Sequence, residues 1–262
     1  MTMPRLVDTH AHLNDPQFER DLDQVLDRAQ EAGVSVIVTV GYDLESSERA
    51  VELAALHEKV FTAVGIHPNH SVETSETDWA RIEELARADK VVAIGETGLD
   101  FYREFAPPNV QISAFERQLR LADDIGLSLI VHSRSAAQEC LDLISALGVP
   151  HRGVVMHCFE GTLHQAARTL DMGMYISANG MATWDNRSDL REMLKVVPAN
   201  RLLIETDAPY LAPKPIGRRR NEPAYLRHVA ECLAELYGIS PDELAEQTAA
   251  NAASLFRIFP GV

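Results

Sequence analysis

Short apolar runs rich in β-branched residues alternate along the chain with longer stretches in which apolar residues recur at helical spacing. The apolar runs predict eight strands, at Leu6–Thr9, Val34–Val40, Val60–Ile66, Val91–Gly95, Leu127–Val131, Gly153–Met156, Met174–Ser177 and Leu202–Thr206. The amphipathic stretches predict helices at Glu19–Ala32, Leu44–His57, Asp78–Ala88, Val110–Ile125, Ala136–Leu147, Leu163–Asp171, Ser188–Val196 and Pro223–Tyr237.

This strict alternation of strand and helix predicts a parallel sheet with right-handed crossovers. Eight such units within 262 residues match the (β/α)8 TIM barrel in number and size. A doubly wound open sheet is the alternative, but no G-x-G-x-x-G segment follows the first strand. Pro241–Ala249 and Asn251–Phe259 are expected to form one or two extra C-terminal helices outside the barrel. Because no linker or composition break divides the chain, residues 1–262 are expected to form a single domain.

Composition and charge narrow the function classes. The chain is 46% hydrophobic and 24% charged, as in a folded globular protein, and its apolar runs are shorter than the roughly 20 residues that span a bilayer. The first residues do not form a charged-then-apolar leader, and the three cysteines include no C-x-x-C pair, so we expect a reducing, cytoplasmic setting without membrane attachment. A net charge of −15 argues against a general polyanion binder and favours a monomer.

Candidate metal ligands follow five of the predicted strands, and the active site of a (β/α)8 barrel lies at the C-terminal ends of its strands. The first strand is followed by two histidines, the fifth and sixth by one each, and the fourth and eighth by carboxylates: His10, His12, Glu96, His132, His157 and Asp207. Any one of these is an ordinary polar residue at a strand end; their joint placement predicts a shared site.

Imidazole and carboxylate donors suit Zn²⁺ or Mn²⁺, and Mg²⁺ where carboxylates dominate. Six ligands exceed the three or so that a catalytic ion takes from a protein, so we expect two divalent ions, with Glu96 as the bridge. Asp8 and Glu205 share strand parity with His10 and Asp207 and are expected either to hydrogen-bond the ligating histidines or to be buried structural carboxylates.

Candidate substrate contacts lie on loops at the same predicted rim. They are His67 after the third strand, Tyr102 and Arg103 after the fourth, Arg134 after the fifth, and Arg218, Arg219 and Arg220 after the eighth. The three arginines end the basic segment Lys214–Arg220, which holds four basic residues and no acid. At least one of them is expected to face away from the site. Trp184 is either a base-stacking residue or a packed loop anchor.

Six segments carry a family resemblance. LVDTHAHLN at 6–14, GETGLDFYR at 95–103, VHSR around His132, MHCFEG at 156–161, LLIETDAPYL at 202–211 and RRNEPAYL at 219–226 resemble the TatD family of metal-dependent deoxyribonucleases, which belongs to the amidohydrolase-like superfamily. The resemblance runs through nearly the whole chain. The sequence departs from the usual pattern at Ser128, where proline is common, and at Gln138, where an acid is common.

The resemblance implies ligand sets and an activity. One ion would be held by His10, His12, Glu96 and Asp207, and a second by Glu96, His132 and His157. The implied reaction is DNA hydrolysis by a metal-activated water, as a 3′-to-5′ exonuclease on single-stranded or fraying ends. In that reaction Asp207 and Glu96 are the expected catalytic residues, with Asp207 as general base.

Two other functions remain open from the residues alone. The first is a small-molecule amide or ester hydrolase of the same superfamily, whose best-known form carries a modified lysine where this chain has Glu96. That difference and the arginine-rich loop favour a phosphodiester. The second is a non-catalytic barrel, which would be expected to have lost one of the ligands.

Overall fold

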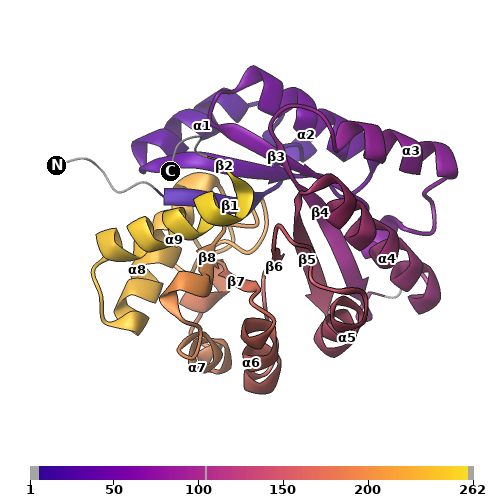
Figure 1. The fold of residues 1–262 in the computed structure, drawn as a ribbon. Coiled ribbons are helices and arrows are strands. Elements are labelled where there is room, and N and C mark those ends of the chain that lie inside the picture. The colour runs from indigo at the N-terminus through magenta and orange to yellow at the C-terminus, as the bar shows by residue number, and fades with distance from the viewer. Residues whose placement is uncertain (1–5, 104, 259–262) are drawn as a thin grey trace.

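The computed structural model describes residues 6–103 and 105–258, and it confirms the predicted (β/α)8 barrel (Figure 1). The strands form one parallel sheet in chain order: β1 (Leu6–Ala11), β2 (Val34–Val40), β3 (Val60–Val64), β4 (Val91–Asp100), β5 (Ser128–Arg134), β6 (Val154–Met156), β7 (Tyr175–Ala178) and β8 (Leu202–Ile204). Each strand follows its predicted position within a few residues except at the end of β4.

Helices surround the strands, as Figure 1 shows. They are α1 (Leu22–Glu31), α2 (Leu44–Leu56), α3 (Glu76–Leu85), α4 (Pro108–Ile125), α5 (Ala137–Leu147), α6 (Leu163–Asp171), α7 (Ser188–Leu194), α8 (Leu226–Tyr237) and α9 (Pro241–Phe256). Capping boxes begin four of them, at Asp43, Ser75, Thr162 and Ser240, because each side chain satisfies backbone N–H groups that have no partner within the helix. Within the described ranges, no helix is both long and apolar enough to cross a membrane.

Strand β4 runs five residues beyond its predicted end and carries Glu96 toward β5. Its pairing with β5 continues from Thr97 opposite Val131 to Asp100 opposite Arg134. Gly98 has a φ of +136°, and a β-carbon there would overlap the carbonyl oxygen of His132. Only glycine allows so close an approach. The glycines in this segment hide the extension from a strand pattern based on β-branched residues, although they make the approach possible.

The barrel closes between β8 and β1 through individual hydrogen bonds instead of a regular ladder. The Thr9 hydroxyl donates to the carbonyl oxygen of Ile204 at 2.9 Å. Beyond the end of β8, the Asp207 N–H donates to the His10 carbonyl at 2.8 Å and the His12 N–H donates to the Ala208 carbonyl at 2.7 Å. Three predicted metal ligands, His10 of β1, His12 directly after it and Asp207 after β8, therefore supply backbone groups of this closure.

Helix α9 covers the N-terminal end of the barrel. Its Ala249, Ala252, Leu255 and Phe256 pack in one cluster with residues of the barrel interior, such as Val7, Val36, Val92, Ile130, Val155 and Leu203. The Ser128 hydroxyl donates to the Leu255 carbonyl at 2.6 Å, satisfying a backbone group that the helix end leaves free. The two expected segments form one continuous helix, the first of the two alternatives, and Phe259 lies outside the described residues.

Because α9 fills the base of the barrel, shortening its buried side chains should destabilise the whole fold. We expect Phe256→Ala (Phe256 is 3% exposed) to lower the free energy of unfolding by about 3–5 kcal/mol, from lost burial and the cavity left behind. Urea unfolding measures this, with Glu246→Ala on the exposed face of α9 as the control. A loss no larger than that of the control would show that α9 is peripheral to stability.

Candidate metal centre

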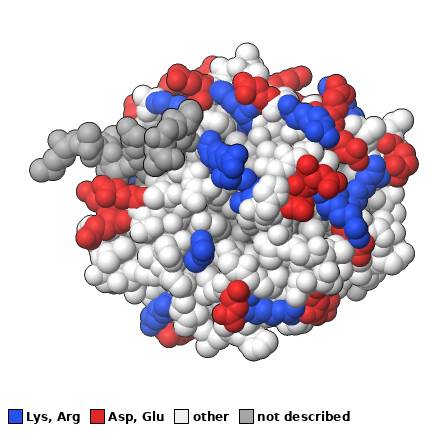
Figure 2. Space-filling view, in the orientation of Figure 1, with Lys and Arg blue, Asp and Glu red and all other residues white. Residues whose placement is uncertain are grey.

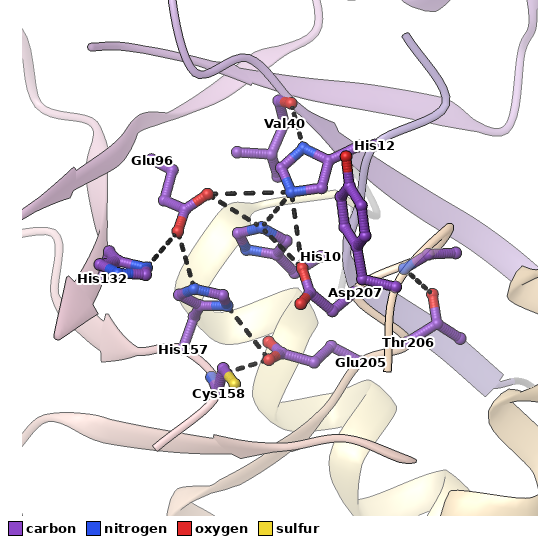
Figure 3. Close-up of polar contacts among 12 residues, drawn as sticks. His10, His12, Val40, Glu96, His132, His157, Cys158, Glu205, Thr206 and Asp207 are labelled. Atoms are coloured by element: carbon purple, nitrogen blue, oxygen red, sulfur yellow. Dashed lines mark hydrogen bonds and ion pairs between the residues drawn. The ribbon is translucent and has the colours of Figure 1, made fainter. Parts of the chain in front are cut away.

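All six predicted ligands gather at the C-terminal end of the barrel (Figure 3). His10 is the second-last residue of β1, and His12 directly follows that strand. Glu96 lies within β4, and His132 lies within β5. His157 and Asp207 follow β6 and β8. Strand alternation places His10 and His12 on one side, as the H-x-H spacing predicts. The structure therefore brings together side chains from five strands that are up to 197 residues apart, from His10 to Asp207.

A first set of donors surrounds the Nε2 atoms of His10 and His12, which lie 3.3 Å apart. Glu96 Oε2 is 3.6 Å from the His10 nitrogen and 3.8 Å from that of His12. Asp207 Oδ1 is 3.8 Å and 3.5 Å from the same two atoms. The His12 Nδ1–H donates to the Val40 carbonyl at 2.9 Å, so the Nε2 lone pair of His12 faces its neighbours.

A second set of donors surrounds the other oxygen of Glu96. Glu96 Oε1 lies 2.7 Å from His132 Nδ1 and 2.9 Å from His157 Nε2. The His157 Nδ1–H donates to Glu205 Oε1 at 3.2 Å, which turns the Nε2 lone pair toward Glu96 and the site. The two carboxylate oxygens of Glu96 are thus divided between the two sets, as Figure 3 shows.

These donors fit divalent cations. The donor atoms of His10, His12 and Glu96 lie within 4.8 Å of one another, as do those of Glu96, His132 and His157. Ligands bound about 2.0–2.2 Å from one ion come this close together. His157 Nε2 is buried without a hydrogen-bond partner, and the lone pair of His12 faces another imidazole nitrogen. A cation would satisfy both, whereas direct contacts among these side chains do not.

The histidines keep both carboxylates ionised. Burial alone would raise the pKa of Glu96, but the facing imidazoles, His157 foremost, hold the pKa well below its usual range. Burial likewise opposes ionisation of Asp207, and the hydrogen bond to His12 together with the nearby His10 outweighs it, so the pKa of Asp207 is lowered. Both groups therefore offer the charged oxygens that a cation requires.

The backbone around Asp207 holds its side chain in an unusual position. Asp207 has a φ of +58°, the left-handed region, which aspartate enters more readily than most residues. Its N–H contacts His10, and its carbonyl accepts from Tyr210 N–H at 2.8 Å. Buried Asn221 donates to the carbonyls of Thr206 and Tyr210 at 2.8 Å and 2.7 Å. The asparagine of the RRNEP segment therefore fixes the loop that carries Asp207.

Of the two expected supporting carboxylates, Glu205 contacts the imidazole of a candidate ligand, whereas Asp8 reaches only the backbone N–H of His10, at 3.4 Å. Glu205 accepts from His157 Nδ1–H and, at 2.7 Å, from the Cys158 N–H. Asp8 instead accepts from the Thr206 N–H at 2.9 Å and the Thr206 hydroxyl at 2.6 Å. Burial raises the pKa of Asp8 to about 7 against these hydrogen bonds. Of the two alternatives for Asp8, the structure shows the buried structural carboxylate, which fixes the segment directly after β8 and holds no ligating imidazole.

His67 approaches the site, and Asp100 is a neighbour that sequence reasoning missed. His67 Nε2 lies 3.7 Å from Glu96 Oε1, while its Nδ1 accepts from the Asn69 N–H at 3.1 Å. His67 Nε2 therefore carries the proton and faces the site as a donor. Asp100 Oδ2 lies 3.7 Å from His132 Nε2, the ring nitrogen on the side away from Glu96. Its place in the same strand as Glu96, four residues on, is the signal that could have found it.

The expected substrate residues at the ends of β4 and β5 form a small cluster at the surface, with Tyr102 and Arg103 exposed and Arg134 partly exposed. The Arg134 guanidinium lies over the Tyr102 ring, 4.2 Å from its centroid, and Tyr102 is exposed. Asp100 Oδ1 accepts from the N–H groups of Tyr102 and Arg103, fixing the start of this loop. Arg103 is exposed as well. The cluster stands beside His132, the residue of β5 that faces Glu96.

The three arginines of the basic segment differ in their contacts. Arg220 donates to both carboxylate oxygens of Asp21, to Glu222 and to the Gln17 carbonyl, and it lies over the Phe18 ring. Its expected substrate contact is therefore corrected: Arg220 ties this loop to the segment before α1. Arg218 and Arg219 instead line a cavity with Trp184, whose indole N–H donates to the Ala212 carbonyl.

Known proteins are similar to this chain along nearly its whole length. The family model described as TatD related DNase matches residues 7–257. An uncharacterized metal-dependent hydrolase, YabD from Bacillus subtilis, is 40% identical and covers 97% of this chain and 99% of its own. A protein of Enterobacter lignolyticus named 3′-5′ ssDNA/RNA exonuclease TatD is also 40% identical, with coverages of 97% and 99%.

A solved structure has the same fold as this chain. The crystal structure of YJJV, a TatD homologue from Escherichia coli K12, superimposes with a TM-score of 0.93 at 31% identity, covering 97% of this chain and 99% of its own. Family model, relatives and structure all match nearly the whole chain, and the donor sets described above account for metal dependence. This chain therefore belongs to the TatD family of metal-dependent hydrolases.

Proposed function

We propose that this protein is a two-metal 3′-to-5′ exonuclease that hydrolyses single-stranded or fraying DNA. The observation that carries the proposal is the division of six donors into two sets that share Glu96. The relative from Enterobacter lignolyticus, named as an ssDNA/RNA exonuclease, supports a nucleic-acid substrate. Arginines at the same rim, partly exposed Arg134 and exposed Arg218 and Arg219, suit a phosphodiester better than an uncharged amide or ester.

The chain would place four donors around one ion, His10, His12, Glu96 and Asp207, and three around the other, Glu96, His132 and His157. Divalent ions bound here supply an acidified water and positive charge for phosphoryl oxygens. Mg²⁺, Mn²⁺ and Zn²⁺ all suit these donors.

Asp207 is the carboxylate best placed to accept a proton from the attacking water. Its side chain is 13% exposed, against 6% for Glu96 and 1% for Glu205. Both oxygens of Glu96 are directed at imidazoles, and Glu205 Oε1 already accepts two hydrogen bonds. Asp207 thus combines access to water with a negative charge that the histidines stabilise. His67 Nε2–H adds a neutral donor on the opposite side of Glu96 for a substrate oxygen.

The test is metal-stripped protein incubated with single-stranded DNA labelled at either end, with Mg²⁺, Mn²⁺ or Zn²⁺ restored in turn. We expect at least one ion to restore cleavage, with labelled mononucleotide released at once from the 3′-labelled strand and a descending ladder from the 5′-labelled one. Glu96→Gln prepared in parallel controls for contaminating nucleases. Hydrolysis of an uncharged ester or amide without any cleavage of DNA would overturn the proposal in favour of the amide or ester hydrolase.

We also propose a single-domain monomer working in the cytoplasm. The described cysteines Cys140, Cys158 and Cys232 are free thiols, which suits a reducing compartment. On the face seen in Figure 2, basic and acidic side chains are interspersed, which does not favour broad attraction of nucleic acid. Binding would then depend on the metal centre and the arginines around it.

A further inference from the structure

A cavity of about 550 Å³ opens between the loop after β7 and the loop after β8. Trp184 and Asp185 line it from the first loop, and Pro209, Arg218 and Arg219 from the second. Pro209 is two residues from Asp207, so one wall of the cavity belongs to the loop that carries this candidate ligand. Its volume lies within the roughly 300–1,000 Å³ typical of sites for small organic ligands.

The two loops are locked together, so the cavity exists before any ligand binds. The Trp184 indole N–H donates to the Ala212 carbonyl at 3.0 Å, and the Lys214 N–H donates to the Thr183 hydroxyl at 2.8 Å. Lys214 also pairs with Asp185 across the cavity wall. A β-carbon at Gly180 would overlap the carbonyl oxygen of Leu211, so the loops are in direct backbone contact there. Preformed walls reduce the entropy lost on binding.

The four cations of the basic segment differ in whether an acidic side chain neutralises them. Lys214 is neutralised by Asp185, and Arg220 by Asp21 and Glu222. Neither Arg218 nor Arg219 forms an ion pair with any residue in 6–103 or 105–258. The two uncompensated guanidinium groups therefore line the same cavity as a partly exposed indole whose only donor is already used.

We propose that this cavity holds the nucleotide next to the scissile phosphodiester, with its base stacked on Trp184 and its phosphate at Arg218 and Arg219. The inference rests on the proposed function. A phosphodiester links two nucleotides, and both extend away from the metal centre when the phosphate is bound there. The cavity, whose wall includes Pro209 two residues after Asp207, is placed to receive one of them. An indole face binds any base, whereas guanidinium groups bind phosphate, so the occupant is a single strand recognised without regard to sequence.

The test compares two substrates that share the same thymidine 5′-phosphate and differ only in the group on the other side of the scissile phosphate. One is the 5′-phosphorylated dinucleotide pTpT; the other is thymidine 5′-monophosphate methyl ester, in which a methyl group replaces the neighbouring nucleotide and its phosphate. We expect wild type to hydrolyse pTpT with a kcat/KM at least about tenfold higher than the methyl ester, because stacking on one aromatic side chain is worth that much. Trp184→Leu and the double variant Arg218→Gln/Arg219→Gln should each reduce this ratio about tenfold. Arg120→Gln, an exposed charge on α4, should leave the ratio unchanged.

Each outcome decides between the two proposals. If wild type cleaves both substrates and the variants keep the wild-type ratio, the cavity is not a nucleotide site. If wild type cleaves neither substrate, the proposed function fails. A separate measurement, binding of a single strand to the cavity, then tests the nucleotide site on its own. The chain has two tryptophans, and Trp79 is buried on α3, so in Trp79→Phe the fluorescence reports Trp184 alone. Quenching by a phosphorothioate-linked single strand would support the site, and its absence would overturn it.

Discussion

The variant Asp207→Asn should lower kcat for DNA cleavage by about 10²- to 10⁴-fold, the usual contribution of a general base. The amide cannot accept a proton from water and is a poorer ligand than the carboxylate. Asparagine tolerates the left-handed backbone at this position as well as aspartate does, so the loop after β8 should persist. The metal-free variant should therefore melt within a few degrees of metal-free wild type, as measured by calorimetry.

Asp171→Asn, an exposed carboxylate at the end of α6, is the matched control and should cleave DNA at the wild-type rate. Activity of Asp207→Asn close to that of the control would move the base elsewhere. Glu205 would be the next candidate, although its contacts with His157 and Cys158 argue for a supporting role.

The variant Glu96→Gln should lose most of its bound metal, because it affects both donor sets at once. Glutamine keeps one oxygen, but its NH₂ group faces either the His10–His12 pair or the His132–His157 pair as a donor where a ligand is needed. Metal analysis by mass spectrometry should fall from two ions per chain to one or none. Ions that bind the folded state stabilise it, so the rise in melting temperature on adding metal should shrink as well.

Glu246→Gln on the exposed face of α9 removes the same charge away from the site and should retain both ions. Two ions per chain in Glu96→Gln would show that Glu96 is not shared between them. Retention of only the ion held by His10, His12 and Asp207 would show that the second set depends on Glu96 more strongly than the first.

The fold and the gathering of the six donors could be predicted because both depend on local rules. Strand–helix alternation determines the barrel topology, and the C-terminal ends of its strands meet at one rim whatever the loops do. His10 and His12 lie on one side because strand side chains alternate. None of these inferences needed the identity of a distant neighbour.

Two misplaced features, Asp8 and Arg220, depend on contacts with residues far away in the sequence. Asp8 shares strand parity with His10, yet its carboxylate reaches Thr206 on the other side of the barrel closure. Arg220 is one residue from Arg219, but Asp21 and Glu222 neutralise it. Ser128, a departure from the family pattern, bonds to the end of α9, a helix whose position no periodicity specifies.

The seam between β8 and β1 also has a mechanical meaning. Hydrogen bonds at the C-terminal end of this seam come from the backbone of His10, His12, Asp207 and Ala208, so the line along which the barrel would part runs through the candidate metal centre. Ions held jointly by side chains from β1 and from the loop after β8 would link the two sides of that seam and oppose their separation. Amide exchange at His12 and Asp207 should then slow when metal binds, and the same two amides would report how often the barrel opens.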